Sequence, residues 1–276
     1  MKPPIDIIDL FPKLNNQLIS FLKKLSTDDW QKQTVAKKWV VKDVAAHLLD
    51  GNFRRIALYR DGWTEAVGSP IFSNKQLVNY LNTLNADWVK ATKRLSPAII
   101  IELLEKTNEE VYQLFKELDP FENAVYAVSW AGETESKNWF DIAREYTERW
   151  LHQQQIRDAL GNKEIMTKEL YYPFLDILMQ AWPFICKDVN AEEGTVLKTE
   201  ITGEGGGEWF LKMQNGKWEI DNIKNTKSVT ETIIDGNAAW KIFSKSVRKD
   251  DIKGSFEIKD NKQLGEKILD MVSVMA

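Results

Sequence analysis

Two residue types that often carry chemistry are scarce in this sequence of 276 residues, which contains one cysteine and two histidines. The single thiol, Cys186, excludes an internal disulfide framework, and such cysteine usage is typical of a protein in a reducing cytoplasm. Because the histidines are His47 and His152 alone, their positions carry unusual weight. Any site that needs two imidazoles must bring these two together.

The sequence also lacks a long apolar run and an excess of basic residues. No run of about eighteen apolar residues occurs, so we expect no membrane span. Lys and Arg total 37 against 41 Asp and Glu, for a net charge of −4. That balance argues against a general nucleic-acid binder, which needs a basic face. The first fourteen residues, MKPPIDIIDLFPKL, place acids among the apolar residues and do not resemble a signal peptide, so we expect a cytoplasmic protein.

Residues 1–162 have the periodicity of helices. Apolar residues recur three and four positions apart, which gives each segment one apolar face. Ser96-Pro97 is typical of a helix start with proline at the first helical position, and Gly161 suits a helix end. The predicted helices cover about 7–25, 39–60, 74–95, 97–118 and 139–160. Helices of this length predict an all-α, up-and-down four-helix bundle with a long loop over 120–137.

Residues 163–276 have a different pattern. A connecting helix is predicted over about 168–188, where Pro183 should kink or end it. Alternating apolar residues then predict strands, and Asn215-Gly216 is a strong signal for a tight hairpin. The predicted strands cover about 195–201, 209–213, 218–220 and 228–234, and two helices cover about 238–247 and 264–275. We therefore expect a second domain, residues 163–276, with a small α+β fold and an antiparallel sheet.

One set of side chains could bind a metal. His47 lies among apolar neighbours on the second predicted helix, so we expect it to face the interior. Glu148 and His152 are four residues apart, so they project from one helical face. Helices that face each other in a bundle could join the three around one divalent cation and leave a coordination position open. The spacing alone leaves two alternatives open, a hydrogen-bonded core histidine and a solvated surface pair.

Two motifs resemble those of a known family. Residues 39–48, WVVKDVAAHL, resemble the W-x-V-[RK]-D-V-x-x-H-L segment of the DinB-like superfamily, and more closely that of the mycothiol-dependent maleylpyruvate isomerase group. Residues 148–161, ERWLHQQQIRDALG, resemble the E-x-x-x-H-x-x-D-x-x-x-A-x-G region of that group. Residues 202–218 resemble the hairpin of the sterol-carrier-like domain that follows its bundle. The resemblance covers nearly the whole chain.

The resemblance implies that His47, Glu148 and His152 bind a divalent metal, with zinc first and nickel or manganese as alternatives. It also implies an enzyme, a thiol-dependent transferase or isomerase, with a low-molecular-weight thiol as co-substrate. A divalent cation stabilises a thiolate over a thiol, so the sulfur can attack near neutral pH. Because Cys186 is interpreted as a small buried apolar residue, we expect the sulfur to come from the co-substrate.

Three arginines are candidate catalytic residues that could hold an anionic, carboxylate-bearing substrate. Arg54 follows His47 by seven residues and Arg144 precedes Glu148 by four, so each shares a helical face with a candidate ligand. The resemblance implies an arginine from the C-terminal domain as well, where Arg248 is the sole arginine after residue 160. A solvated or salt-bridged arginine is the alternative for each.

Three functions remain open from the sequence. The first is the thiol-using metal enzyme, similar to maleylpyruvate isomerase. The second is a metal-dependent hydrolase or lyase that uses bound water and no thiol. The third is a non-enzymatic module that binds an apolar ligand between Trp209, Trp218 and Trp240. In each case we expect a small-molecule ligand, and a monomer or homodimer.

Overall fold

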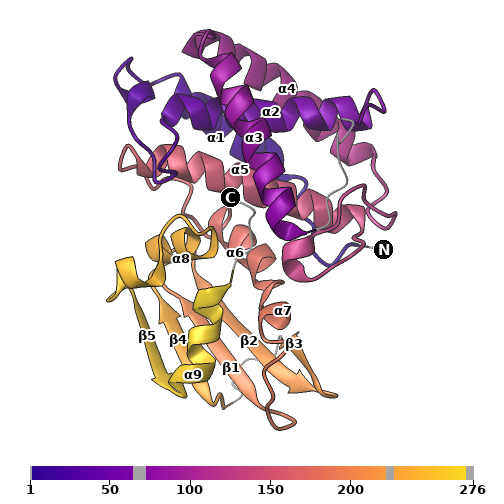
Figure 1. Cartoon of the computed structure of the whole chain (residues 1–276), viewed down its shortest axis with the longest axis vertical. Helices are drawn as coiled ribbons and strands as arrows, with labels where there is room; N and C mark the ends of the chain where they lie inside the picture. The colour runs from indigo at the N-terminus through magenta and orange to yellow at the C-terminus, as the bar shows by residue number, and fades with distance from the viewer. Residues whose placement is uncertain (1, 65–72, 222–226, 272–276) are drawn as a thin grey trace. The chain divides into compact units, whose positions relative to one another are not determined.

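The computed structural model describes residues 2–64, 73–221 and 227–271 (Figure 1). The chain divides into two compact units. We call Met1–Glu122 with Glu148–Ile165 the helical unit, and Asn123–Thr147 with Met166–Ala276 the sheet unit. Within the described ranges, every helix is too short or too polar to cross a lipid bilayer. The domain boundary expected after residue 162 stays a prediction.

The helical unit confirms the prediction of a helical N-terminal region. It contains α1 (Leu10–Leu22), α2 (Val41–Tyr59), α3 (Asn74–Thr92), α4 (Pro97–Glu117) and the part of α5 (Asn138–Asp158) that begins at Glu148. Helix α2 packs against α3 and α4, and α1 packs against α4 (Figure 1). The Ser96 hydroxyl accepts a hydrogen bond from the Ile99 N–H, and Pro97 begins α4, as the sequence predicts.

The apolar core of the helical unit explains why α2 is held firmly. Its buried residues come from α1, the following 3₁₀ turn (Asp29–Gln31), α2, α4 and α5. On α2 they form one continuous stripe, Val41, Val44, Ala45, Leu48 and Leu49, each at most 7% exposed. These positions are three and four residues apart, as expected for a helix with one buried face. Because His47 lies between them, its place on α2 is fixed by packing.

The described residues of the sheet unit form five strands and short helices. Its helices are the first part of α5 with α6 (Tyr171–Met179), α7 (Trp182–Ile185), α8 (Gly236–Phe243) and α9 (Lys262–Gly265), and its 3₁₀ turns are Ser129–Ala131, Lys249–Ile252 and Glu266–Asp270. Its strands are β1 (Val196–Ile201), β2 (Gly207–Gln214), β3 (Lys217–Asp221), β4 (Thr230–Ile234) and β5 (Phe256–Asp260). The predicted connecting helix is divided into α6 and α7, with Pro183 in the first turn of α7.

The sheet is mixed, so the expectation of an antiparallel sheet is wrong. The strand order is β3-β2-β1-β4-β5, and β1 pairs with β4 in parallel while the other three pairings are antiparallel. The reason is topological. Hairpins force antiparallel pairing between successive strands, but β1 and β4 are not successive, and no turn constrains their relative direction.

The hairpin between β2 and β3 confirms the Asn215-Gly216 prediction. Both residues have positive φ, 52° and 72°, which suits the twist of a two-residue hairpin turn. The last predicted helix is shorter in the structure, as α9 and the 3₁₀ turn Glu266–Asp270, and its expected end over 272–275 lies outside the described residues.

Candidate metal centre

The helical unit brings the three predicted ligands close to one another. His47 comes from α2, and Glu148 and His152 come from α5. The two imidazole ring centroids are 4.6 Å apart, with the rings edge to face at 80°. Glu148 Oε2 lies 3.4 Å from His152 Nε2. Across the described ranges, no three His, Cys, Asp or Glu side chains form a ready-made metal-binding cluster, so the role of these residues as ligands stays a prediction.

The start of α2 is capped by the side chain of Asp43. The Asp43 carboxylate accepts a hydrogen bond from the Val40 N–H at 3.2 Å, so Asp43 stabilises the helix N-terminus. His47 follows one turn later and is partly buried. On α5 the side chain of His152 is 9% exposed and that of Glu148 is 25% exposed. The set therefore lies at the border of the core, where a small molecule could reach it.

Hydrogen bonding orients His152. Gln155 Oε1 lies 2.9 Å from His152 Nδ1, and because an amide oxygen only accepts, this contact favours the tautomer with the proton on Nδ1. In the neutral ring, Nε2 is then an acceptor that faces the Glu148 carboxylate. Two acceptors at 3.4 Å repel each other unless a proton or a cation lies between them. An imidazole held through its second nitrogen is the usual arrangement of a histidine that ligates a metal, so the donor set fits a divalent cation.

Trp39 covers this set on one side. Its indole centroid is 4.8 Å from the His47 ring and 6.3 Å from the His152 ring. The turn that leads into α2 holds it in place, because the Thr34 hydroxyl and the Gln33 side-chain amide each donate to the Trp39 carbonyl at 2.8 Å. An aromatic ring against both imidazoles restricts their rotation and keeps water from that side.

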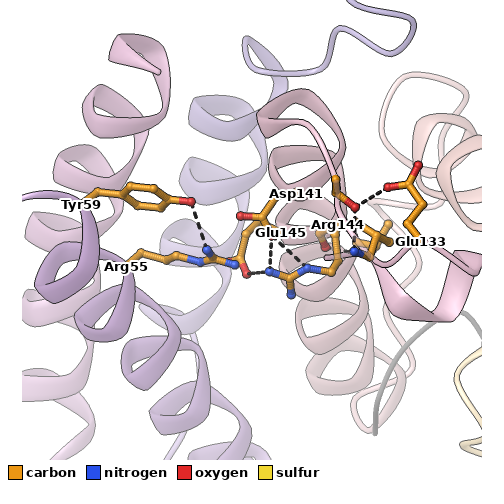
Figure 2. A network of polar contacts seen from close by, with 9 residues as sticks. Arg55, Tyr59, Glu133, Asp141, Arg144 and Glu145 are labelled. Atoms are coloured by element: carbon orange, nitrogen blue, oxygen red, sulfur yellow. Dashed lines mark hydrogen bonds and ion pairs between the residues drawn. The ribbon is translucent and has the colours of Figure 1, made fainter. Parts of the chain in front are cut away.

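The three candidate arginines are all ion-paired. Arg54 is half exposed and contacts Asp50 at 3.1 Å, in an open groove between α2 and α3. Figure 2 shows the Arg144 guanidinium directed at Asp141 and Glu145, at 2.6 Å and 3.0 Å. Arg248 is 84% exposed and contacts Asp251 at 3.4 Å. These contacts are those of salt-bridged arginines, and a part in catalysis stays a prediction for all three.

The sequence reasoning missed a polar cluster in the core of the helical unit. Arg149 of α5 is 6% exposed and donates hydrogen bonds to asparagines of three other helices, Asn15, Asn52 and Asn108. A signal was present, because each asparagine interrupts an apolar helical face. Arg55, also missed, is 5% exposed and donates to the Tyr59 hydroxyl at 3.4 Å (Figure 2).

Comparison with known proteins bears on this unit first. The model of the mycothiol maleylpyruvate isomerase N-terminal domain matches residues 11–157, more than half of the chain. The chain belongs to this family. The matched residues contain His47, Glu148 and His152, and the resemblance drawn from the two motifs is confirmed.

Solved structures extend the similarity of this family member to both units. A histidine-to-alanine mutant of the mycothiol-dependent maleylpyruvate isomerase is 10% identical, with a TM-score of 0.52 over 91% of this chain and 91% of that chain. The isomerase without the mutation gives the same identity and TM-score over 88% and 89%. At this identity the likeness shows the fold. No curated protein matches the sequence.

Proposed function

We propose that this chain is a divalent-metal-dependent enzyme that uses a low-molecular-weight thiol, in a transfer or isomerisation similar to that of mycothiol-dependent maleylpyruvate isomerase. One observation carries the proposal. The Nε2 atom of His152 faces the Glu148 carboxylate at 3.4 Å beside the His47 ring, and its Nδ1 atom is engaged by Gln155. Family membership supports the thiol.

In this proposal His47, Glu148 and His152 hold the metal, zinc first and nickel or manganese as alternatives. When bound, the cation stabilises a thiolate over a thiol and so supplies a nucleophile near neutral pH. Other side chains of the protein orient the ligands and shield them from water. Gln155 favours the His152 tautomer in which the lone pair of Nε2 is available to a metal. Trp39 limits the entry of water.

In this proposal the sulfur comes from the co-substrate, because the protein's own thiol, Cys186, is unreactive. Cys186 is fully buried, and burial raises the pKa of its thiol to about 11. A buried thiol with that pKa is neither accessible nor ionised at neutral pH. We also propose a cytoplasmic location, where a lone cysteine stays reduced.

A carboxylate-bearing substrate would need a cation, and we propose Arg54 and Arg248 ahead of Arg144 for that part. Arg54 and Arg248 keep exposed guanidinium groups with one acidic partner each. Arg144 is 18% exposed and already contacts two carboxylates, so a substrate would have to displace one of them. The fold completes the proposal, with α1, α2, α4 and α5 as an up-and-down four-helix bundle.

Metal content tests the proposal. We expect near-stoichiometric zinc, nickel or manganese in tag-free protein by elemental mass spectrometry, and loss of the metal in His47→Ala and in Glu148→Ala. Glu105→Ala is the matched control, since Glu105 is another glutamate of the helical unit and contacts Lys23 at the surface. Wild-type protein that stays free of metal after reconstitution would contradict metal dependence and favour a ligand-binding module.

Thiol binding separates the proposed enzyme from the alternative hydrolase or lyase, which would use the same ligands. The measurement is calorimetric titration of the metal-loaded protein with mycothiol and, separately, with cysteine. Serine is the control for cysteine, because it differs only in having a hydroxyl oxygen in place of the thiol sulfur. We expect a thiol to bind and serine not to bind. Equal heats for cysteine and serine would favour the hydrolase or lyase. The third function has less support, because Trp209, Trp218 and Trp240 are each at most 5% exposed and pack as core residues.

A further inference from the structure

The buried cluster around Arg149 joins four helices through one side chain. Its Nη1 atom donates to Asn108 Oδ1 of α4 at 3.0 Å and lies 3.4 Å from Asn15 Oδ1 of α1. Its Nη2 atom donates to Asn52 Oδ1 of α2. The amide nitrogen of Asn52 donates in turn to Asn108 Oδ1 and to the Thr107 hydroxyl, each at 2.8 Å. One arginine therefore contacts one asparagine from each of the three other helices.

This cluster contributes little net free energy to the stability of the fold. Asn52 is fully buried, and Asn108 and Arg149 are 4% and 6% exposed. A guanidinium group loses several kcal/mol of solvation on burial, and hydrogen bonds return only part of it. Well-packed apolar residues at such positions are often as stable or more stable. Buried hydrogen bonds are directional and apolar contacts are not. Hydrogen bonds between helices therefore fix how far one helix is rotated and shifted against another.

The cluster lies beside the candidate metal ligands along both helices that carry them. Arg149 directly follows Glu148 and precedes His152 by three residues on α5. Asn52 follows His47 by five residues on α2. A helix turns about 100° and rises about 1.5 Å per residue, so a shift of one residue between α2 and α5 would separate the two imidazoles. The hydrogen bond from Arg149 to Asn52 spans the same pair of helices that must stay in register.

We propose that Arg149 and Asn52 are positioning residues of the metal centre, which lock α2 against α5 so that His47 meets His152 and Glu148. The proposal rests on the proposed function. Its structural content, the dependence of the distance between the imidazoles on the clamp, holds with or without metal. The Arg149–Asn52 hydrogen bond would act through the relative position of α2 and α5.

Because the chain has only two histidines, NMR tests the clamp without metal. Selective labelling of histidine leaves two imidazole rings, and centroids 4.6 Å apart give a strong inter-ring nuclear Overhauser effect. We expect this effect in the metal-free wild type and its loss in Asn52→Leu and Arg149→Met. Arg149→Lys keeps the charge but not the guanidinium fork, so it is the milder variant, with the effect weakened, if the others do not fold.

Leu104→Ala is the matched control, since Leu104 is a fully buried residue of α4 that belongs to the apolar core. It lowers stability without removing a hydrogen bond of the cluster, so the inter-ring effect should persist. If folded clamp variants keep the wild-type inter-ring effect, or if Leu104→Ala loses it equally, the clamp proposal is overturned.

Metal affinity gives the second readout in the same proteins. By competition with a chelator, we expect Asn52→Leu and Arg149→Met to bind zinc about 10- to 100-fold more weakly, the range seen when outer contacts of metal ligands are removed. Leu104→Ala should bind as the wild type does. If the wild type binds no metal, the proposed function fails while the NMR result still decides the clamp.

Discussion

The helical unit and the five-stranded sheet bury polar groups in different ways. The core of the helical unit contains whole charged and amide side chains, among them Asn52, Arg149 and Arg157, each at most 6% exposed. The polar groups buried within the sheet are the hydroxyls of Thr199, Thr230 and Thr232. Its charged side chains are all at least partly exposed, and Lys198, at 19% exposure, contacts Glu208 at 2.5 Å and Glu231 at 2.8 Å.

The difference indicates two kinds of core. Ion pairs that water still reaches each contribute about 1 kcal/mol or less, so the sheet depends on apolar packing of residues such as Trp209, Leu211 and Met213. The helical unit accepts a desolvation penalty in order to fix directions inside a bundle of helices. That penalty is expected where geometry matters more than stability, and the histidine and glutamate set lies in this unit.

Removal of an apolar core side chain from the sheet unit should have the largest effect. Trp240 on α8 is fully buried, and Trp240→Ala should lower the free energy of unfolding by about 3–5 kcal/mol, measured by urea titration. Trp63→Ala is the control, since Trp63 is 69% exposed and should change little. A small effect of Trp240→Ala would contradict an apolar origin of stability in the core that contains Trp240.

The burial of Cys186 in the sheet unit should slow its alkylation. Because burial raises the pKa of Cys186 to about 11, the ionised fraction at pH 8 is about 100-fold lower than for an ordinary thiol. Alkylation by iodoacetamide should therefore be at least that much slower in native protein than in urea-unfolded protein. The raised pKa also means that the thiol stabilises the fold below its ordinary pKa, and that this contribution is lost as the pH rises towards 11. Equally fast alkylation of native and unfolded protein would contradict the burial and the raised pKa of Cys186.

Removal of a buried charge from the helical unit should have a smaller effect than removal of Trp240. The Arg157 guanidinium donates to Asn162 Oδ1 at 2.6 Å, to Glu164 Oε2 at 2.9 Å and to the Gln17 carbonyl at 3.0 Å. Arg157→Met should cost about 2 kcal/mol in unfolding free energy, because lost hydrogen bonds are offset by relief from desolvation. A cost as large as that of Trp240→Ala would remove the contrast between the two cores.

The smallest effect should come from the exposed partner of that arginine. The hydrogen bond from Arg157, and then that from Asn162, lower the pKa of the Glu164 carboxyl below its usual value of 4.5. A lowered pKa stabilises the fold above the usual value, and the contribution is lost as the pH falls below it. Since Glu164 is 64% exposed, solvent screening limits this to a few tenths of a kcal/mol.

Thermal unfolding between pH 6 and pH 3 measures this contribution. The melting temperature of the wild type should fall slightly more than that of Glu164→Gln as the pH drops. Glu105→Gln, another surface carboxylate of the helical unit, serves as the comparison variant. Identical pH profiles for the wild type and Glu164→Gln would contradict the lowered pKa.

The sequence predicted the elements and motifs that local patterns determine. Ser96-Pro97 marks a helix start and Asn215-Gly216 a hairpin through local backbone preferences. The parallel pairing of β1 with β4 has no such local mark. Strand β5 was missed because its alternating charged residues, Glu257 and Lys259, gave no apolar run.

The candidate site divides in the same way. The two motifs led to His47, Glu148 and His152, whose side chains are close together in the structure. The asparagines that interrupt apolar helical faces indicate buried polar groups, but the sequence does not show that they meet at Arg149, because that depends on the rotation of four helices relative to one another. A sequence records which face of one helix is apolar, and it does not record which residue on the next helix lies opposite.

The strands at the two ends of the described sheet order have a consequence for how the protein behaves in concentrated solution. Both β3 and β5 are five residues long and bear exposed charged side chains, Lys217 and Glu219 on one and Glu257 and Lys259 on the other. Short, charged end strands resist the addition of a strand from a neighbouring molecule, which would have to desolvate those charges. The placement of charge on these two strands therefore protects the protein against ordered aggregation, and this protection does not depend on a bound ligand.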